Sequence, residues 1–238
     1  GAVVEVNSET DFVAKNDMFQ EYVADAALVA LMHNGEVCDM KTFQCPKVHK
    51  SFEERLTDLI AKIGENMNLR RAAMLEVSNG VIASYVHNAC KPNLGKIGVL
   101  VALESNGDKA KLQELGKHIA MHVAASNPQF LTIADVDQAS IDHEKAIFSE
   151  QAKASGKPEN IIEKMVEGRI KKYFDEVVLE EQAYIMDPDK KVKQIVADAA
   201  KEMGADIKLK AFVCFRLGEG LEKRNEDFAA EVASQLKK

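Results

Sequence analysis

The sequence lacks the features that mark membrane, secreted and disulfide-stabilised proteins. Its 238 residues contain no apolar run near the roughly 18 residues that a membrane-spanning helix needs, and no signal-peptide pattern opens the chain. The four cysteines are widely spaced and form no CxxC pair, which favours a reducing compartment. We therefore expect a soluble, cytoplasmic protein with no membrane partner.

The patterns of common nucleotide-binding and catalytic sites are also missing. No GxxxxGK[ST] run could form a phosphate-binding loop, and no GxSxG elbow is present. His118 and His122 have the i, i+4 spacing of zinc ligands, but Ile119 occupies the place of the general base in HExxH. Glu9 and Asp11 could form an acid/base pair, although loop carboxylates more often cap helices or face solvent. We predict no enzyme, no metal site and no cofactor.

The composition indicates a folded protein with a modestly acidic surface. Hydrophobic residues make up 46% of the chain, which is enough for real cores. The formal net charge of -7 argues against a broad nucleic-acid footprint. We expect no direct nucleic-acid partner.

In the first third of the chain, apolar spacing predicts alternating strands and helices. The expected elements are a strand at Val3–Val6, a polar loop at 7–11, a helix at Asp17–Met32, a loop at 33–46, an amphipathic helix from Phe52 that Gly64 ends, and strands at Asn68–Val77 and Val81–Val86. The Asn79-Gly80 pair is a turn signal, so the last two strands are expected to form an antiparallel hairpin.

The rest of the chain begins with a weak echo of the first strand and helix. A strand at Ile97–Leu103 precedes a helix at 112–126, and then 135–179 is charged and helical, with turn residues at Ser155–Pro158. Its apolar positions are spaced four, four, three and four apart, and they are Ile162, Val166, Ile170, Tyr173 and Val177. The remaining predicted elements are an extended piece at 183–188, a helix at Val192–Met203, a strand at Lys208–Leu217 and a terminal helix from Asn225.

These elements describe an α+β protein. We expect two related subdomains with small, mostly antiparallel sheets packed by helices, and a protruding antiparallel helical hairpin. The predicted division is an N-subdomain at 1–86, a C-subdomain in two parts at 87–134 and 180–220, the hairpin at 135–179 and a C-terminal helix at 221–238.

Seven segments, in order along the whole chain, resemble the elongation factor Ts family. They are VEVNSETDFVAKNDMFQ, AKIGENMNLRR, SYVHN, GKIGVLVAL, KHIAMHVAASNPQF, SGKPENIIEKMVEGRIKKYF and LGEGLEK. The small helical domain with which members begin has no match here, so we expect this sequence to start inside a longer chain. The segment CKPNL, at 90–94, is similar to no family motif and looks like an insertion.

The resemblance implies a guanine nucleotide exchange factor of translation elongation. Its partner is then elongation factor Tu, from which it promotes GDP release before GTP displaces it, and a bacterial cytoplasm is the simplest location, with an organelle as the alternative. In the family, the Asp-Phe pair intrudes on the partner's nucleotide domain near its magnesium side. The positions that match family contacts are Thr10, Asp11, Phe12, Val13, Ile63, Gly64, His87, Ile185 and Met186.

Phe12 decides between a structural and a binding interpretation of the opening segment. An isolated aromatic residue most often covers its own core. In a loop at the end of a strand it can equally be an exposed wedge, because loops present binding residues on a rigid scaffold. The resemblance favours the wedge.

Two other functions stay open from the residues. The first is a scaffold that self-associates as a homodimer through the hairpin, and deletion of Asp135–Leu179 would abolish that role while sparing most exchange. The second is a metal-dependent hydrolase built on His118 and His122, which metal analysis of the purified protein would test.

Overall fold

The computed structural model describes residues 1–45, 48–153 and 158–221. The helices are α1 (Asp11–Ala14), α2 (Asp17–Met32), α3 (Val37–Thr42), α4 (Phe52–Ile63), α5 (Lys109–Ser126), α6 (Gln138–Lys153), α7 (Glu159–Val177) and α8 (Val192–Met203), with 3-10 turns η1 (Ile133–Asp135) and η2 (Leu179–Glu181). The strands are β1 (Ala2–Ser8), β2 (Gln44–Cys45), β3 (Lys50–Ser51), β4 (Met67–Met74), β5 (Gly80–His87), β6 (Ile97–Glu104), β7 (Ala183–Tyr184), β8 (Asp187–Lys191) and β9 (Lys208–Arg216). Among these described helices, none has both the length and the apolar character needed to cross a membrane.

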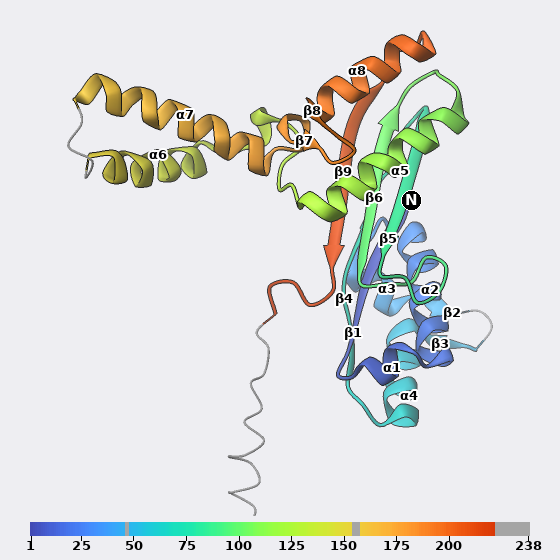
Figure 1. The fold of residues 1–238 in the computed structure, drawn as a ribbon. Coiled ribbons are helices and arrows are strands. Elements are labelled where there is room, and N and C mark those ends of the chain that lie inside the picture. Colours follow the sequence, from blue (N-terminus) through green and yellow to red (C-terminus); the bar gives the residue numbers. More distant parts are fainter. Residues whose placement is uncertain (46–47, 154–157, 222–238) are drawn as a thin grey trace, which may run out of the picture.

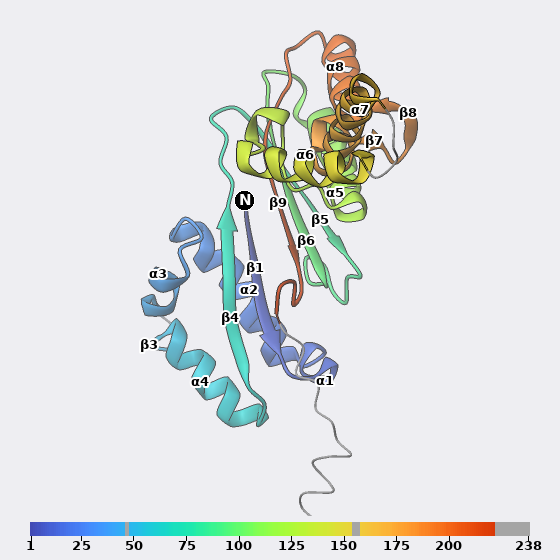
Figure 2. The same cartoon turned by 90° about the vertical axis from the view of Figure 1, so that its left-hand side faces the viewer.

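Two antiparallel sheets form the body of the molecule and lie against each other (Figures 1 and 2). β1 pairs with β4 in one sheet, and β6 lies between β5 and β9 in the other. The sheets approach closely at Gly98, where a Cβ would lie 2.9 Å from Cγ2 of Val3. Arg71 of β4 also lies over the ring of Phe215 of β9, 4.3 Å from its centroid. Both observations place β1 and β4 against the face of β6 and β9.

Helices cover the outer faces of both sheets and complete two hydrophobic cores. Because side chains alternate along a strand, one set of β6 residues faces α5 while the other faces the first sheet. The first core contains Phe19, Ala26, Phe52, Leu56 and Leu69 among its buried residues. The second contains Val99, Val101, Ile119, Val123 and Val192. The fold is therefore α+β with small antiparallel sheets, as the sequence predicts.

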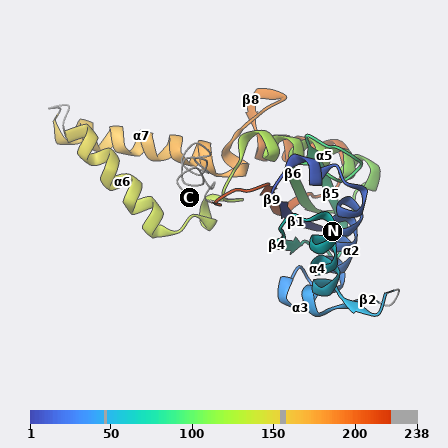
Figure 3. The same cartoon turned by 90° about the horizontal axis from the view of Figure 1, so that it is seen from below.

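The α6–α7 hairpin projects from this body (Figures 1 and 3). A small cluster of Val136, Val177 and Val178 packs at its base. On α7, the predicted apolar stripe is buried at Ile170 and Val177 and partly buried at its other positions. Because this burial arises within a single chain, little of the stripe is left for a second copy.

Three helices have the bounds that their sequences predict, and capping explains three of their ends. At the start of α4, the Ser51 side chain accepts from the Glu54 N–H and the Glu54 carboxylate accepts from the Ser51 N–H, forming a capping box. The same helix ends at Gly64, whose φ of 85° is in the left-handed region that glycine adopts readily. The Asn16 side chain caps the start of α2 by accepting from the Met18 and Phe19 N–H groups. α8 also matches its predicted range.

The predicted hairpin at Asn79-Gly80 is wrong. β4 pairs with β1, and β5 pairs with β6, so the turn passes the chain from one sheet to the other. Gly80 is needed for a different reason: its φ is 154°, and a Cβ there would collide with the carbonyl oxygen of Leu103 on the neighbouring strand. In the sequence, a glycine that is required by the close approach of a neighbouring strand looks the same as a glycine that is required by a turn.

Two short helices also lie where the sequence predicts loops. α1 begins at Asp11, the last residue of the predicted polar loop, and continues to Ala14, before the predicted start of α2, and α3 lies within the loop predicted at 33–46. One turn or two of helix offers too few positions for an apolar period to be recognised. The predicted Ser155–Pro158 turn, apart from Pro158, and the predicted terminal helix from Asn225 lie outside the described residues.

The division into subdomains stays a prediction, and packing favours a change to its first boundary. Val81 and Tyr85 of β5 pack on the second core, together with β6 and α5. We therefore propose that the C-subdomain begins before Gly80, rather than at residue 87.

Candidate functional site

The one-turn helix α1 buries one of two neighbouring side chains and exposes the other. Val13 is only 3% exposed and belongs to the first core, whereas Phe12 is 83% exposed. A buried neighbour fixes the helix to the body, so the Phe12 ring is held in solvent on a supported segment. Val13 itself offers almost no surface, so the structure does not favour it as a contact residue.

Two carboxylates link α1 to segments that are distant in the sequence. The Thr10 N–H donates to Glu65 Oε2 over 3.1 Å, and Thr10 Oγ1 lies 2.8 and 2.9 Å from the two Glu65 carboxylate oxygens. On the other side, Lys96 Nζ lies 3.4 Å from Asp11 Oδ1. Glu65 lies two residues after the end of α4, and Lys96 directly precedes β6. The opening segment is thus attached to both halves of the body.

Through these links, the structure brings together three of the family motifs named above. Gly64 is exposed beside Glu65, and Ile63 is partly buried against the first core. His87 is exposed at the end of β5, where its Nδ1 lies 3.0 Å from the Tyr85 hydroxyl and its carbonyl accepts from the Lys96 N–H. The candidate site therefore consists of Thr10, Asp11, Phe12, Ile63, Gly64 and His87, with Glu65 and Lys96 as links.

Ile185 and Met186 form a second exposed apolar group, at the turn between β7 and β8. They are 42% and 49% exposed, while the preceding Tyr184 is buried. The Ile185 N–H donates to Nδ1 of His122 over 3.3 Å, and Nε2 of the same ring lies 2.8 Å from Oε1 of Gln182. Since Nδ1 accepts, Nε2 carries the proton and donates to Gln182. A neutral histidine therefore supports this turn.

Burial governs the charge state of His122. Its side chain is fully buried, and burial lowers its pKa below the usual value, although the hydrogen bond to Gln182 opposes that shift. Both ring nitrogens are engaged with protein groups, so neither has a free lone pair for a metal ion. His118, one turn earlier, is only partly buried. The zinc interpretation of this pair is therefore not favoured, and within the described ranges no three metal-ligating side chains gather.

Buried Glu5 ties the strand before the site to the segment that follows β9. Its carboxylate accepts from Arg70 Nη1 at 2.9 Å, Arg71 Nε at 2.5 Å, the Gly218 N–H at 2.9 Å and Asn7 Nδ2 at 2.9 Å. Burial opposes the charge, but these donors outweigh it and hold the pKa of Glu5 below its usual value. The paired arginines of the AKIGENMNLRR segment thus have a structural role.

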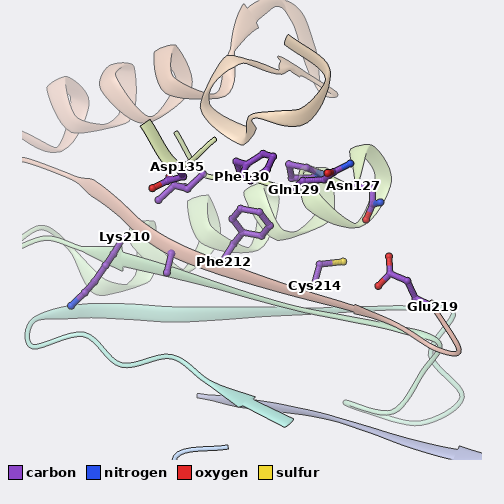
Figure 4. A pocket seen from close by; sticks show the side chains of 11 residues that line it. Asn127, Gln129, Phe130, Asp135, Lys210, Phe212, Cys214 and Glu219 are labelled. Carbon is purple, nitrogen blue, oxygen red and sulfur yellow. The ribbon is translucent and has the colours of Figure 1, made fainter. Parts of the chain in front are cut away.

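A pocket of about 550 Å³ lies between β9 and the segment Asn127–Asp135 (Figure 4). Phe212 points from the strand toward Phe130, with Cys214 further along β9. None of the residues that line this pocket is one that the sequence assigns to a partner contact.

Sequence reasoning missed the residues that hold the candidate site in place. Glu65 lies inside a segment that carries the family resemblance, but that segment drew attention only to Ile63 and Gly64. His122 was considered as a metal ligand rather than as a support for Ile185. In both cases the partner is more than 50 positions away in the chain, as in Thr10 to Glu65, where the separation is 55, so no local pattern could reveal it.

Comparisons with known proteins agree with the family resemblance of these sequence motifs. A protein-family model described as elongation factor TS matches residues 9–219. A protein of Rhodospirillum rubrum named elongation factor Ts is 56% identical over 239 residues, covering 100% of this chain and 77% of that protein. Proteins of the same name from Paramagnetospirillum magneticum and Caulobacter vibrioides are 56% and 55% identical, covering 99% and 97% of this chain and 75% and 74% of theirs. The chain belongs to the elongation factor Ts family of translation elongation factors.

Proposed function

We propose that this protein is a guanine nucleotide exchange factor for elongation factor Tu. The observation that carries the proposal is Phe12, which is held in solvent on a helix whose next residue is buried. A soluble domain gains nothing in its own stability from a phenylalanine in that position. An exposed, supported aromatic side chain is instead typical of an anchor that fills a pocket on a partner.

The wedge acts by favouring the partner conformation in which a pocket for Phe12 is open. Burial of a phenylalanine side chain contributes about 2 kcal/mol, and only the open conformation gains it. If opening displaces the magnesium ligands and phosphate-binding amides, GDP loses contacts, and each ~1.4 kcal/mol lost makes its binding tenfold weaker. The exposed carboxylate of Asp11 lies beside Phe12 and adds negative charge near the cation.

The remaining candidate residues extend the contact on both sides of the wedge. Ile63, Gly64 and His87 lie at the same end of the molecule as α1, through the Glu65 and Lys96 links. The exposed pair Ile185 and Met186 lies on the C-subdomain and suits a second domain of the partner. We propose these five positions as contacts that add affinity.

Linkage makes the process reversible without any covalent step. A factor that weakens nucleotide binding must itself be weakened by nucleotide through the same coupling free energy. Incoming GTP therefore displaces the factor. We propose no catalytic residue, because exchange requires only differential binding.

A homodimer through the hairpin is not part of the proposal. The apolar stripe of α7 that suggested it is at least partly buried against the rest of the same chain.

Release of a fluorescent GDP analogue from elongation factor Tu tests the proposal directly. The chain should accelerate release at substoichiometric concentration, and excess GTP should dissociate the complex of the two proteins. If release stays at its spontaneous rate while the chain still binds nucleotide-free elongation factor Tu, the protein is a binding partner and the exchange function is rejected.

A further inference from the structure

We propose that Glu65 is the positioning residue for Phe12: its carboxylate holds Thr10, and thereby the start of α1, in the orientation that presents the Phe12 ring. This inference rests on the exchange function proposed above and adds a residue to it. Glu65 is not itself required to touch the partner.

The need for such a residue follows from the size of α1. The helix spans only Asp11–Ala14, and helices this short have no stability of their own. Thr10 occupies the N-cap position, yet its side chain makes no capping hydrogen bond to the helix. Its hydroxyl and its N–H both bind Glu65 instead. The orientation of α1 is therefore set from outside the helix.

The other attachments near the start of α1 cannot provide the same control. Val13 inserts into the core and fixes the position of the helix, but burial of one apolar side chain is not directional. The Asp11–Lys96 pair is 3.4 Å long, with both side chains mostly exposed, and such pairs contribute little. Hydrogen bonds to a charged carboxylate are stronger and directional. At the other end of the helix, Gln20 Nε2 donates to the Ala14 carbonyl over 2.8 Å, so Glu65 is the directional attachment that holds the start of α1, beside Phe12.

Glu65 also connects two groups of candidate contacts. It follows Gly64, the left-handed residue that ends α4 and turns the chain away from the helix axis. The turn brings the carboxylate to Thr10, so that Ile63 and Gly64 belong to the same rigid surface as Phe12. A single side chain thus makes one binding surface from two segments 55 positions apart.

The test compares the nucleotide-exchange kinetics of the Glu65→Ala variant with those of the unmodified chain. Without the carboxylate, α1 samples other orientations and only part of the population can bind, so the apparent affinity falls. We expect KM to rise about tenfold, the scale of lost hydrogen bonds to a charged acceptor, with kcat nearly unchanged. Glu65→Gln keeps one acceptor oxygen and should raise KM only about threefold.

A matched control exists elsewhere in the chain. The Thr132 N–H and Oγ1 both bind Asp135 Oδ2, each at 2.8 Å, so Asp135→Ala removes the same kind of contact outside the candidate site. This variant should leave KM unchanged. Equal KM values for Glu65→Ala and the unmodified chain, or an equal rise in Asp135→Ala, would overturn the inference.

A measurement without the partner separates this inference from the exchange function. Amide hydrogen exchange reports on α1 through Thr10, whose N–H binds Glu65, and Lys15, whose N–H binds the Phe12 carbonyl. In Glu65→Ala and in Glu65→Gln, both amides should exchange at least about fivefold faster, while the α2 amides stay protected. Unchanged protection in both variants would reject Glu65 as the positioning residue, even if the unmodified chain accelerates GDP release. Faster amide exchange supports the positioning role even if the chain fails to accelerate GDP release, a result that rejects only the exchange function.

Discussion

Phe12 and the Ile185–Met186 turn both present apolar side chains to solvent beside a buried neighbour, but different interactions hold them. The first is fixed at the surface, where the exposed Thr10 binds the Glu65 carboxylate. The second is fixed from inside, where fully buried His122 accepts from the Ile185 N–H. A support at the surface can be removed at little cost to the fold, whereas a buried support is part of the core. Substitutions should therefore separate function from stability in one region and couple them in the other.

The largest difference should appear when each support is removed. His122→Ala deletes a fully buried side chain and two hydrogen bonds, so the free energy of unfolding should fall by about 3 kcal/mol. Glu65→Ala should lower it by less than about 1 kcal/mol, because the contact is near the surface. Urea denaturation measures both. Similar losses of unfolding free energy in the two variants would contradict the distinction between a surface support and a buried one.

The two exposed groups should also affect different kinetic constants. Replacing both Ile185 and Met186 by alanine should raise KM for exchange about 30-fold, since about 2 kcal/mol of apolar burial is lost, and should leave kcat unchanged. Phe12→Ala should instead lower kcat, because its burial favours the open partner conformation. Steady-state release of labelled GDP gives both constants. A lower kcat in the Ile185/Met186 variant would place that turn in the opening step.

A smaller expected effect is a dependence of the free energy of unfolding on pH that comes from the buried support, His122. Burial lowers the pKa of His122 in the folded protein below its value in the unfolded chain, which is about 6.5. The unfolded state therefore binds more protons below that pH, so the stabilising contribution is present above pH 6.5 and is lost as pH falls toward the folded pKa. For one group the slope is at most about 1.4 kcal/mol per pH unit.

His122→Gln should flatten the stability profile between pH 7 and pH 5.5, and His118→Gln serves as the control one turn away. If His118→Gln flattens the stability profile and His122→Gln does not, the pH dependence does not come from His122.

The sequence predicts the helices better than the strand pairing, for a physical reason. α2 and α4 have caps and apolar stripes within their own residues, so Asn16, Ser51 and Gly64 mark their ends locally. Strand partners are chosen by packing between distant segments, and the Asn79-Gly80 signal for a hairpin is overruled by the pairing of β1 with β4 and β5 with β6. Local patterns determine elements, while burial determines their neighbours.

The candidate site shows the same limit at the scale of single residues. The residue type alone would bury Phe12, its position in a loop allowed either burial or exposure, and the family resemblance favoured exposure. Neither source distinguished Phe12 from Val13, because the one-turn helix that exposes one and buries the other is too short to leave a periodic pattern. Glu65 and His122 act through contacts more than 50 positions away, such as the 63 positions between His122 and Ile185. These roles require the folded arrangement.

The central claim is that Phe12 is a wedge rather than a core residue, and the maximal rate of GDP release with Phe12→Ala tests it most directly. Leu28→Ala is the matched control, because Leu28 is a large apolar residue on α2 that is 60% exposed and lies outside the candidate site. We predict that Phe12→Ala lowers the maximal rate about 30-fold, the equivalent of about 2 kcal/mol, with an unchanged melting temperature, and that Leu28→Ala changes neither. A maximal rate that survives Phe12→Ala, or a fold that does not, would contradict the wedge.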